Sequence, residues 1–241
     1  MVPQRRYIVA ATPRTGSYLL CGGLEATWVA GRPAEAFVPE FQHIWRRLWS
    51  LDRNAGFDQY FQAAIRHGTG SNGIYGLKIH WLQVGALARH ASLCEPGADV
   101  LERLFPNSQF VNIVRRDRTA QALSYLRALQ TNEWWHIDGV VNDQRNGAQP
   151  VFDAAAVRRL AHGLTLQQAA WEEYFAQRGI EPLTIEYEAL VEDYHRQIQR
   201  VLEFLGLDAS PARTIPPPVL VRQSDALTLE WRELLQRDRY A

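Results

Sequence analysis

Apolar residues in this chain follow two patterns, short continuous runs and longer segments of helical spacing. Four apolar runs rich in β-forming residues, at residues 6–11, 74–80, 109–115 and 183–186, predict buried strands. Spacings of three and four residues predict helices at residues 17–28, 41–66, 82–90, 99–104, 119–129, 154–178, 194–205 and 227–237. Because strands alternate with helices, we expect an α/β fold in which helices flank a mostly parallel sheet of about four or five strands.

The ends of the helices and the connections between them add detail. Leu20, Leu24 and Trp28 recur every four residues and predict one buried face of the first helix. Gly206 is typical of a residue that ends a helix, here the one at residues 194–205. Residues 136–150 predict a surface loop. No fixed repeat and no long linker divides the chain, so we expect a single domain over residues 1–241.

The charge balance excludes a strong overall field. Lys+Arg and Asp+Glu both total 26, which gives no reason to expect nucleic acid or an anionic membrane as a partner. Cys21 and Cys94 are too few for a disulfide framework, and no stretch approaches the ~20 apolar residues of a membrane span. The polar N-terminus leads straight into a strand and predicts no signal peptide. The simplest interpretation is a cytoplasmic protein of bacterial type.

The loop after the first strand has the features of an anion-binding turn. A strand, a short loop with Gly16 and a helix beginning at Ser17 direct free backbone N–H groups at an anion, and Arg14 adds a positive charge. A tight turn also joins strands to helices where nothing binds, so the loop alone does not establish a site. The Walker pattern with its Gly-Lys-Ser/Thr is missing, as is the three-glycine dinucleotide fingerprint.

A second group of candidate residues ends the second strand. Lys78 is the only lysine in the chain. Side chains alternate along a strand, so Lys78 and His80 share one face. If this strand adjoins the first, Lys78 comes close to the loop at residues 11–17, where it would stabilise negative charge. The alternative is a lysine on the surface or in an ion pair without a catalytic role.

Several segments resemble the motifs of sulfotransferases that use 3′-phosphoadenosine 5′-phosphosulfate (PAPS). Residues 12–17 (TPRTGS) resemble the loop for the donor's 5′-phosphosulfate, and residues 113–117 (IVRRD) with Ser124 resemble the element for its 3′-phosphate. Near the C-terminus, the matching segments are residues 185–191 (IEYEALV), 220–225 (LVRQSD) and 230–231 (EW). Among sub-families, the chain is most similar to the bacterial trehalose sulfotransferases, through residues 29–37 (VAGRPAEAF) and 121–131 (QALSYLRALQT).

This resemblance implies an α/β fold with a P-loop-like strand–loop–helix and transfer of a sulfuryl group from PAPS to a hydroxyl. It implies a carbohydrate or glycolipid acceptor, with a trehalose-like sugar as the lead, a homodimer, and no metal ion. The donor-binding residues that it implies are Arg14, Thr15, Gly16, Ser17, Tyr18, Arg115, Arg116, Ser124, Tyr187, Arg222 and Gln223. The catalytic residues are Glu35, Lys78 and His80.

The chain departs from the family pattern in two places. Tyr18 occupies a position that is usually a small hydroxyl residue for the 5′-phosphate. The second element is ambiguous, because Arg115 lies nine residues before Ser124, as in the trehalose-type relatives, and Arg116 lies eight before it, as in animal-type enzymes. We retain both arginines and favour Arg115.

Two residues compete for the role of general base. The resemblance to the trehalose-type enzymes points to Glu35, whereas animal-type enzymes carry a Lys-x-His like Lys78-x-His80 with the histidine as base. An imidazole has an ordinary pKa of about 6.5 and is the easier base, while a carboxylate needs its pKa raised by its surroundings. The wider sequence match favours Glu35, with His80 as a substrate contact or alternative base. For Trp81 and Trp134 we favour packing over stacking on a sugar.

Two other functions remain open from the sequence. One is a nucleotide- or glycan-binding module of the same fold that has lost catalysis, which Tyr18 motivates. The other is a small-molecule kinase, which the missing Gly-Lys-Ser/Thr makes improbable. The acceptor side of the site is expected from residues 37–70 and 136–150, and the sequence does not identify the acceptor.

Overall fold

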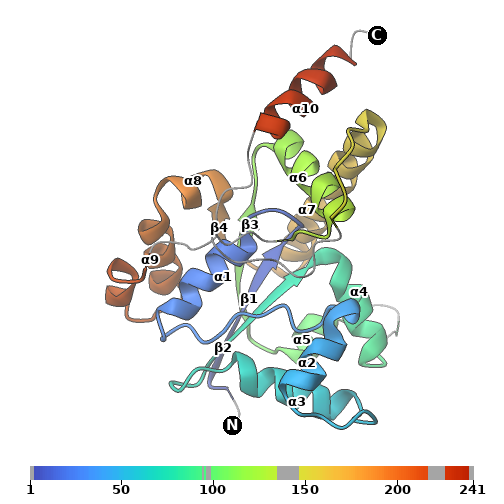
Figure 1. The fold of residues 1–241 in the computed structure, drawn as a ribbon. Helices are drawn as coiled ribbons and strands as arrows, with labels where there is room; N and C mark the ends of the chain where they lie inside the picture. Colours follow the sequence, from blue (N-terminus) through green and yellow to red (C-terminus); the bar gives the residue numbers. More distant parts are fainter. Residues whose placement is uncertain (1–2, 94, 96–98, 135–146, 217–225, 239–241) are drawn as a thin grey trace.

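The computed structural model describes residues 3–93, 95, 99–134, 147–216 and 226–238. Within them, four strands form one parallel sheet in the order β2-β1-β3-β4 (Figure 1). The strands are β1 (Arg5–Ala11), β2 (Ile74–His80), β3 (Gln109–Val114) and β4 (Leu183–Glu186). The predicted α/β fold with a parallel sheet of four strands is confirmed.

Helices cover both faces of this sheet. On one face lie α1 (Ser17–Ala26), α8 (Tyr187–Glu192) and α9 (Tyr194–Phe204), and on the other lie α3 (Phe57–Gly68), α4 (Trp81–His90), α5 (Val100–Leu104) and α7 (Ala154–Arg178) (Figure 1). The remaining elements are α2 (Gln42–Leu48), α6 (Arg118–Thr131), α10 (Ala226–Arg237) and the 3-10 turns η1 (Pro39–Phe41) and η2 (Ser210–Arg213). The two faces bury separate apolar clusters, which is the layered arrangement that the alternating elements predict.

The register of β1 and β2 brings two sequence-predicted groups together. Val9 of β1 lies opposite Lys78 of β2, and Ala11 lies opposite His80. Because the strands are parallel, the end of β2 and the loop that follows β1 meet at the same edge of the sheet. Leu77 and Ile79 belong to the apolar cluster under α4 and α7, so the alternate residues Lys78 and His80 face the other side, as predicted.

The single helix predicted at residues 41–66 is wrong, because the chain forms α2 and α3 with a turn between them. Ser50 has φ 52°, in the left-handed region. Asn54 N–H donates to Asp52 Oδ1 at 2.7 Å, and Gly56 precedes α3 in an extended conformation. Short polar side chains of this kind compete with helical hydrogen bonds. The apolar spacing continues across the turn and conceals it.

The expected buried position of Trp28 is also wrong. The helix α1 ends at Ala26, where Thr27 Oγ1 donates to Leu24 O at 2.6 Å. Trp28 then takes φ 61° and is 75% exposed. In contrast, Gly206 does follow α9 with φ 64°, and Leu207 N–H donates to Leu202 O at 2.9 Å, which closes the helix end.

The last helix, α10, packs against α6 and α7 (Figure 1). Trp231 is buried in this contact, and Arg232 forms an ion pair with Asp117 at the start of α6. Arg127 donates to Thr228 Oγ1 at 3.0 Å. Residues 217 and 218 of the predicted connector lie outside the described residues. Arg222 and Gln223 lie outside them as well.

Candidate active site

The loop between β1 and α1 has the geometry of an anion cradle. Arg14 (φ 65°) and Gly16 (φ 79°) both take the left-handed conformation. The first intrahelical bond runs from Leu20 N–H to Gly16 O at 3.1 Å, which leaves the preceding N–H groups at the helix end for an anion. Ser17, at the start of the helix, is buried.

Buried hydrogen bonds fix the conformation of this loop. Thr15 Oγ1 donates to Thr12 O at 2.9 Å. Gln121 of α6 donates to Thr12 Oγ1 at 2.9 Å and to Pro13 O at 2.6 Å. All three side chains that make these bonds are fully buried, so the side chain of Thr15 braces the loop and does not line the cleft described below. Gln121 is a positioning residue that the sequence reasoning missed.

Gly16→Ala is expected to destabilise the fold and to distort the anion cradle. A Cβ at Gly16 would lie 2.5 Å from Tyr187 Cδ2, and φ 79° is unfavourable for alanine. Together, these effects are expected to cost about 1–3 kcal/mol of the free energy of unfolding, measured by denaturant titration. Gly22→Ala is the matched control, because nothing lies within 4 Å of its Cβ position inside α1. It is expected to be neutral or to stabilise by about 0.5–1 kcal/mol. Equal effects of the two substitutions would contradict the assigned geometry.

Two arginines converge above the loop. Arg14 Nε donates to Ser124 Oγ at 2.9 Å. Arg115 Nη1 donates to Arg14 O at 3.2 Å, and its guanidinium lies 4.4 Å from the ring centre of Tyr187. Burial, and then the nearby charge of Arg115, lower the pKa of Arg14 to about 10. Two half-buried cations that disfavour each other, beside a helix N-terminus, are suited to an anion.

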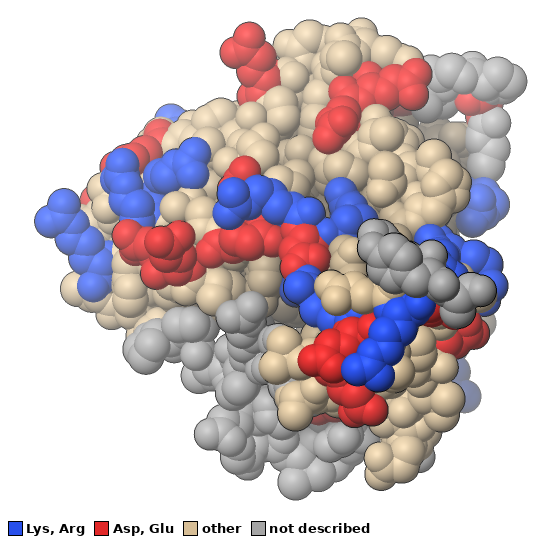
Figure 2. All heavy atoms as spheres, turned by 90° about the horizontal axis from the view of Figure 1, so that it is seen from above, with Lys and Arg blue, Asp and Glu red and all other residues tan. Residues whose placement is uncertain are grey.

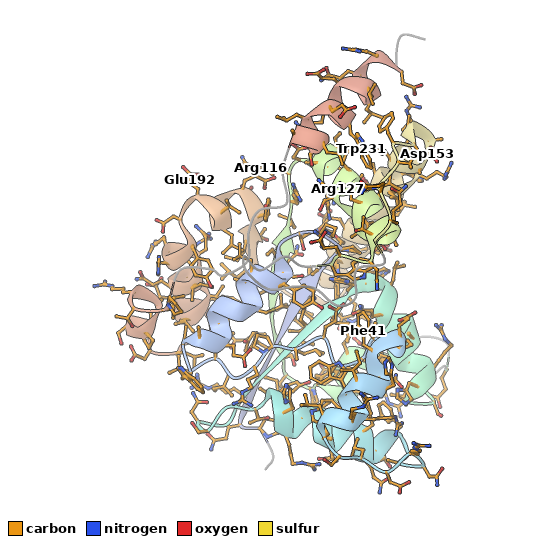
Figure 3. All side chains as sticks on the ribbon, viewed as in Figure 1. Phe41, Arg116, Arg127, Asp153, Glu192 and Trp231 are labelled. Carbon is orange, nitrogen blue, oxygen red and sulfur yellow. The ribbon has the colours of Figure 1, made fainter. Side chains whose placement is uncertain are left out.

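Arg116 does not reach this group. Its side chain is 66% exposed and pairs with Glu186 at 3.2 Å and Glu188 at 3.9 Å. Glu188 also accepts from the N–H groups of Arg116 at 3.2 Å and Asp117 at 3.1 Å. Figure 3 shows Arg116 near α8. The structure therefore brings Arg115, the favoured arginine, to the site and directs Arg116 away from it.

Glu35 is held against β2 by its backbone. Lys78 N–H donates to Ala34 O at 3.1 Å, so the segment before Glu35 runs beside β2. Trp45 Nε1 donates to Glu35 O at 3.2 Å, and Tyr60 Oη donates to Ala36 O at 2.6 Å. These two aromatics fall within the region that we expected to bind the acceptor. Here they fix the position of Glu35.

The carboxylate of Glu35 meets three polar side chains. Lys78 Nζ forms a buried ion pair with it, His80 Nδ1 lies 3.3 Å from Glu35 Oε1, and Gln83 Nε2 donates to Oε1. Gln83 Oε1 accepts from His80 N–H at 2.9 Å and so ties the carboxylate to the start of α4. The sequence reasoning missed Gln83. In the sequence, Gln83 is indicated only by its place three residues after His80, which ends the strand. That place is the capping-box position of the next helix.

The charges of this group depend on one another. Lys78 is 1% exposed and Glu35 is 9% exposed. Burial alone would raise the pKa of Glu35, but the Lys78 ammonium, followed by His80, lowers it to about 2. Burial alone would lower the pKa of Lys78, but the Glu35 carboxylate raises it above its usual range. The pair is therefore ionised near neutral pH.

His80 is expected to stay neutral over the physiological pH range. Burial lowers its pKa from 6.5 to about 4, against the opposing influence of Glu35. The unfolded chain binds this proton below about pH 6.5, so this group reduces the free energy of unfolding as pH falls from 6.5 to 4. A ¹⁵N NMR titration, with His80→Gln to assign the resonance, is expected to show no titration of His80 between pH 5.5 and 8. A midpoint near 6.5 would contradict the burial of this ring.

Tyr18 lies over the Glu35–Lys78 pair. Its ring centre is 3.4 Å from Lys78 Nζ, and 41% of the residue is exposed. Burial raises the pKa of its phenol to about 12, so the hydroxyl stays neutral. The ring thus closes one side of the Glu35–Lys78 pair.

One cleft of about 700 Å³ runs from the loop after β1 to Glu35. It is lined by Arg14, Gly16, Ser17, Tyr18, Glu35, His80, Gln83, Arg115, Ser124 and Tyr187, and also by Val38, Phe41 and Leu82. Lys78, which is 1% exposed, lies behind this lining. Figure 3 shows Phe41 close to α4. In the view of Figure 2, basic and acidic side chains are interspersed, so positive charge is not a general property of that surface.

The two tryptophans have different positions. Trp81 packs against Trp171 at a ring separation of 5.0 Å, which is the packing role that we favoured. Trp134 lines the cleft, its carbonyl accepts from Arg14, and its ring lies 6.1 Å from Tyr125.

Among the described residues, no cluster of His, Cys, Asp and Glu has the arrangement of a metal site. None of the described helices is both long and apolar enough to span a membrane.

Residues 6–238 match the family of Stf0 sulphotransferases, so the chain belongs to that family and is a sulfotransferase. Two relatives are trehalose 2-sulfotransferases. That of Mycolicibacterium smegmatis is 30% identical, with 96% of this chain and 94% of the relative covered. That of Mycobacterium tuberculosis (strain Erdman) is 31% identical, with 94% and 92% covered. A sulfotransferase structure from Alicyclobacillus acidocaldarius is 12% identical, covers 98% of this chain and 93% of its own, has a TM-score of 0.50 and supports the fold alone.

Proposed function

We propose that this sulfotransferase moves the sulfuryl group of PAPS to a hydroxyl of a sugar, with trehalose as the lead acceptor. The observation that carries the proposal is Glu35, which pairs with the buried Lys78 and lines the same cleft as the anion loop and two converging arginines. The donor is a polyanion and fits the positive end of this cleft. Two relatives named trehalose 2-sulfotransferase support the acceptor.

The donor would lie with its 5′-phosphosulfate at the N-terminal end of α1. The N–H groups at this end and the Ser17 hydroxyl are the donors available to the phosphosulfate oxygens. Arg115 with Ser124 is suited to the 3′-phosphate, and Tyr187 to the adenosine portion. Arg222 and Gln223, which the family motif also assigns to the donor, lie outside the described residues.

Transfer is an in-line displacement at sulfur. The acceptor oxygen forms a bond to sulfur while the bond from sulfur to the bridging oxygen of the 5′-phosphate breaks, and its electron pair leaves with the phosphate. Glu35 takes the proton of the acceptor hydroxyl, and the Lys78 ammonium stabilises the charge on the bridging oxygen. The products are a sulfate ester and adenosine 3′,5′-bisphosphate.

The low pKa of Glu35 depends on the charge of Lys78. The Lys78 ammonium is the main influence that lowers it, and burial acts in the opposite direction. When Lys78 shares its charge with the leaving phosphate, it lowers the pKa of Glu35 less. Burial then raises the pKa, and the carboxylate becomes more basic. This coupling supports Glu35 as the base. His80 remains the alternative base, and a homodimer remains a prediction from the family.

Two measurements test this proposal. Adenosine 3′,5′-bisphosphate is expected to raise the melting temperature, and Arg115→Ala combined with Arg222→Ala is expected to abolish that rise. Radiolabelled PAPS is then incubated with a panel of sugars that includes trehalose, and sulfate transfer is scored. No stabilisation at millimolar bisphosphate would overturn the donor assignment. Bisphosphate binding without transfer to any acceptor would favour a binding module that has lost catalysis.

A further inference from the structure

The side chain of Tyr18 occupies a different part of the cleft from the one that the family's loop pattern indicates. At this position the pattern calls for a small hydroxyl on the donor's 5′-phosphate. The Tyr18 ring instead covers Lys78 Nζ at 3.4 Å from the ring centre. It therefore lies above the Glu35–Lys78 pair, where the acceptor hydroxyl has to approach.

The anion cradle is complete without a side chain at position 18. Its N–H groups belong to the backbone at the start of α1, and the hydroxyl of Ser17 is buried beside them. Arg14 and Arg115 supply the positive charge. The replacement of a small hydroxyl by tyrosine therefore removes one side-chain hydrogen bond and leaves the main features of a phosphate site in place.

The exposed part of Tyr18 borders the cleft beside Glu35. One side of its ring contacts the ammonium of Lys78, while 41% of the residue remains exposed. Glu35 and Val38 line the cleft with it, and the exposed side chain of Leu82 lies on the α4 side. An aromatic ring with a neutral hydroxyl, next to a carboxylate, suits a sugar, because the C–H face of the sugar packs on the ring while its hydroxyls bond the polar groups.

We propose that Tyr18 is an acceptor-binding residue that orients the sugar hydroxyl toward Glu35, and that it does not bind the donor phosphate. This inference rests on the proposed function. The ring also packs against the Lys78 ammonium, which is 1% exposed, and so helps to exclude water from it. Loss of the ring therefore weakens acceptor binding and promotes transfer of the sulfuryl group to water.

Tyr18→Ser and Tyr18→Phe test the assignment when compared with Tyr187→Ser. For Tyr18→Ser we expect the KM for trehalose to rise about tenfold or more and the Kd for adenosine 3′,5′-bisphosphate to change less than about threefold. Release of sulfate from PAPS without acceptor is expected to increase. Tyr18→Phe keeps the ring and is therefore expected to raise the KM for trehalose less than Tyr18→Ser does. Tyr187→Ser is expected to have the opposite effect, raising the Kd for the bisphosphate more than the KM for trehalose.

The outcomes separate this inference from the proposed function. A Tyr18→Ser protein that loses about tenfold in bisphosphate affinity would overturn the assignment whatever the acceptor is. An unchanged KM for trehalose, in a protein that sulfates trehalose, would overturn it as well. If the unsubstituted protein neither binds the bisphosphate nor consumes PAPS, the proposed function fails, and the inference about Tyr18 fails with it.

Discussion

Glu35→Gln is expected to lower kcat by a factor of about 10²–10⁴, because it removes the carboxylate that we propose as the general base. It also leaves Lys78 charged and buried without its carboxylate. Breaking a buried ion pair in this way costs about 3–5 kcal/mol. For a chain of this length, that corresponds to a fall in melting temperature of about 6–20 °C. Calorimetry and initial rates with PAPS measure the two effects separately.

The double substitution Glu35→Gln with Lys78→Met separates the two roles of the pair. It removes both charges, so we expect the melting temperature to recover in part while the rate stays low. Glu95→Gln is the matched control, because Glu95 pairs with Arg103 at 3.3 Å with both side chains more than half exposed. An exposed pair of this kind contributes about 0–1 kcal/mol. A Glu35→Gln protein as stable as Glu95→Gln would contradict the buried pair.

Arg115→Ala is expected to raise the Kd for adenosine 3′,5′-bisphosphate about 100-fold or more. Its guanidinium supports the loop through Arg14 O and lies over Tyr187, so its loss removes the charge that we propose for the 3′-phosphate and loosens both partners. Charged hydrogen bonds contribute about 1.5–3 kcal/mol each, and 1.4 kcal/mol corresponds to a factor of ten in Kd. Isothermal calorimetry at two salt concentrations measures the loss.

Arg116→Ala provides the control for that experiment on the neighbouring residue. Arg116 is two-thirds exposed and pairs with Glu186 and Glu188, so its removal is expected to change the Kd less than about threefold. The two substitutions remove the same charge from adjacent positions. Equal losses would show that net charge, and not the geometry of Arg115, governs donor binding.

Much of the fold follows from local patterns in the sequence. The four apolar runs predict the strands, and their alternation with helices predicts the parallel sheet. The sequence pattern does not predict the turn between α2 and α3, because the apolar spacing of residues 41–66 continues across Ser50 and Gly56. Likewise, Thr27 closes α1 before Trp28 and leaves that side chain exposed, although the spacing of four residues continues. Periodicity reports which residues are apolar, and not where the backbone changes direction.

The candidate site was predictable where it depends on the order of the strands. Parallel pairing of β1 and β2 is enough to bring Lys78 beside the loop at residues 11–17. The contacts of Gln83 and Gln121 were not predictable, since they depend on how α4 and α6 pack against the sheet. The direction of the Tyr18 ring and the separation of Arg115 from Arg116 likewise depend on side-chain packing between segments distant in the sequence.

The burial of Lys78 has a practical consequence for the chemistry of the whole molecule. Lys78 is the only lysine in the chain and is 1% exposed. Amine-directed reagents such as N-hydroxysuccinimide esters therefore meet no accessible lysine on the folded protein, and immobilisation or fluorescent labelling through lysine will be poor. Conversely, acylation of Lys78 detected by mass spectrometry would report the exposure of the buried Glu35–Lys78 pair, at a single residue and without an activity assay.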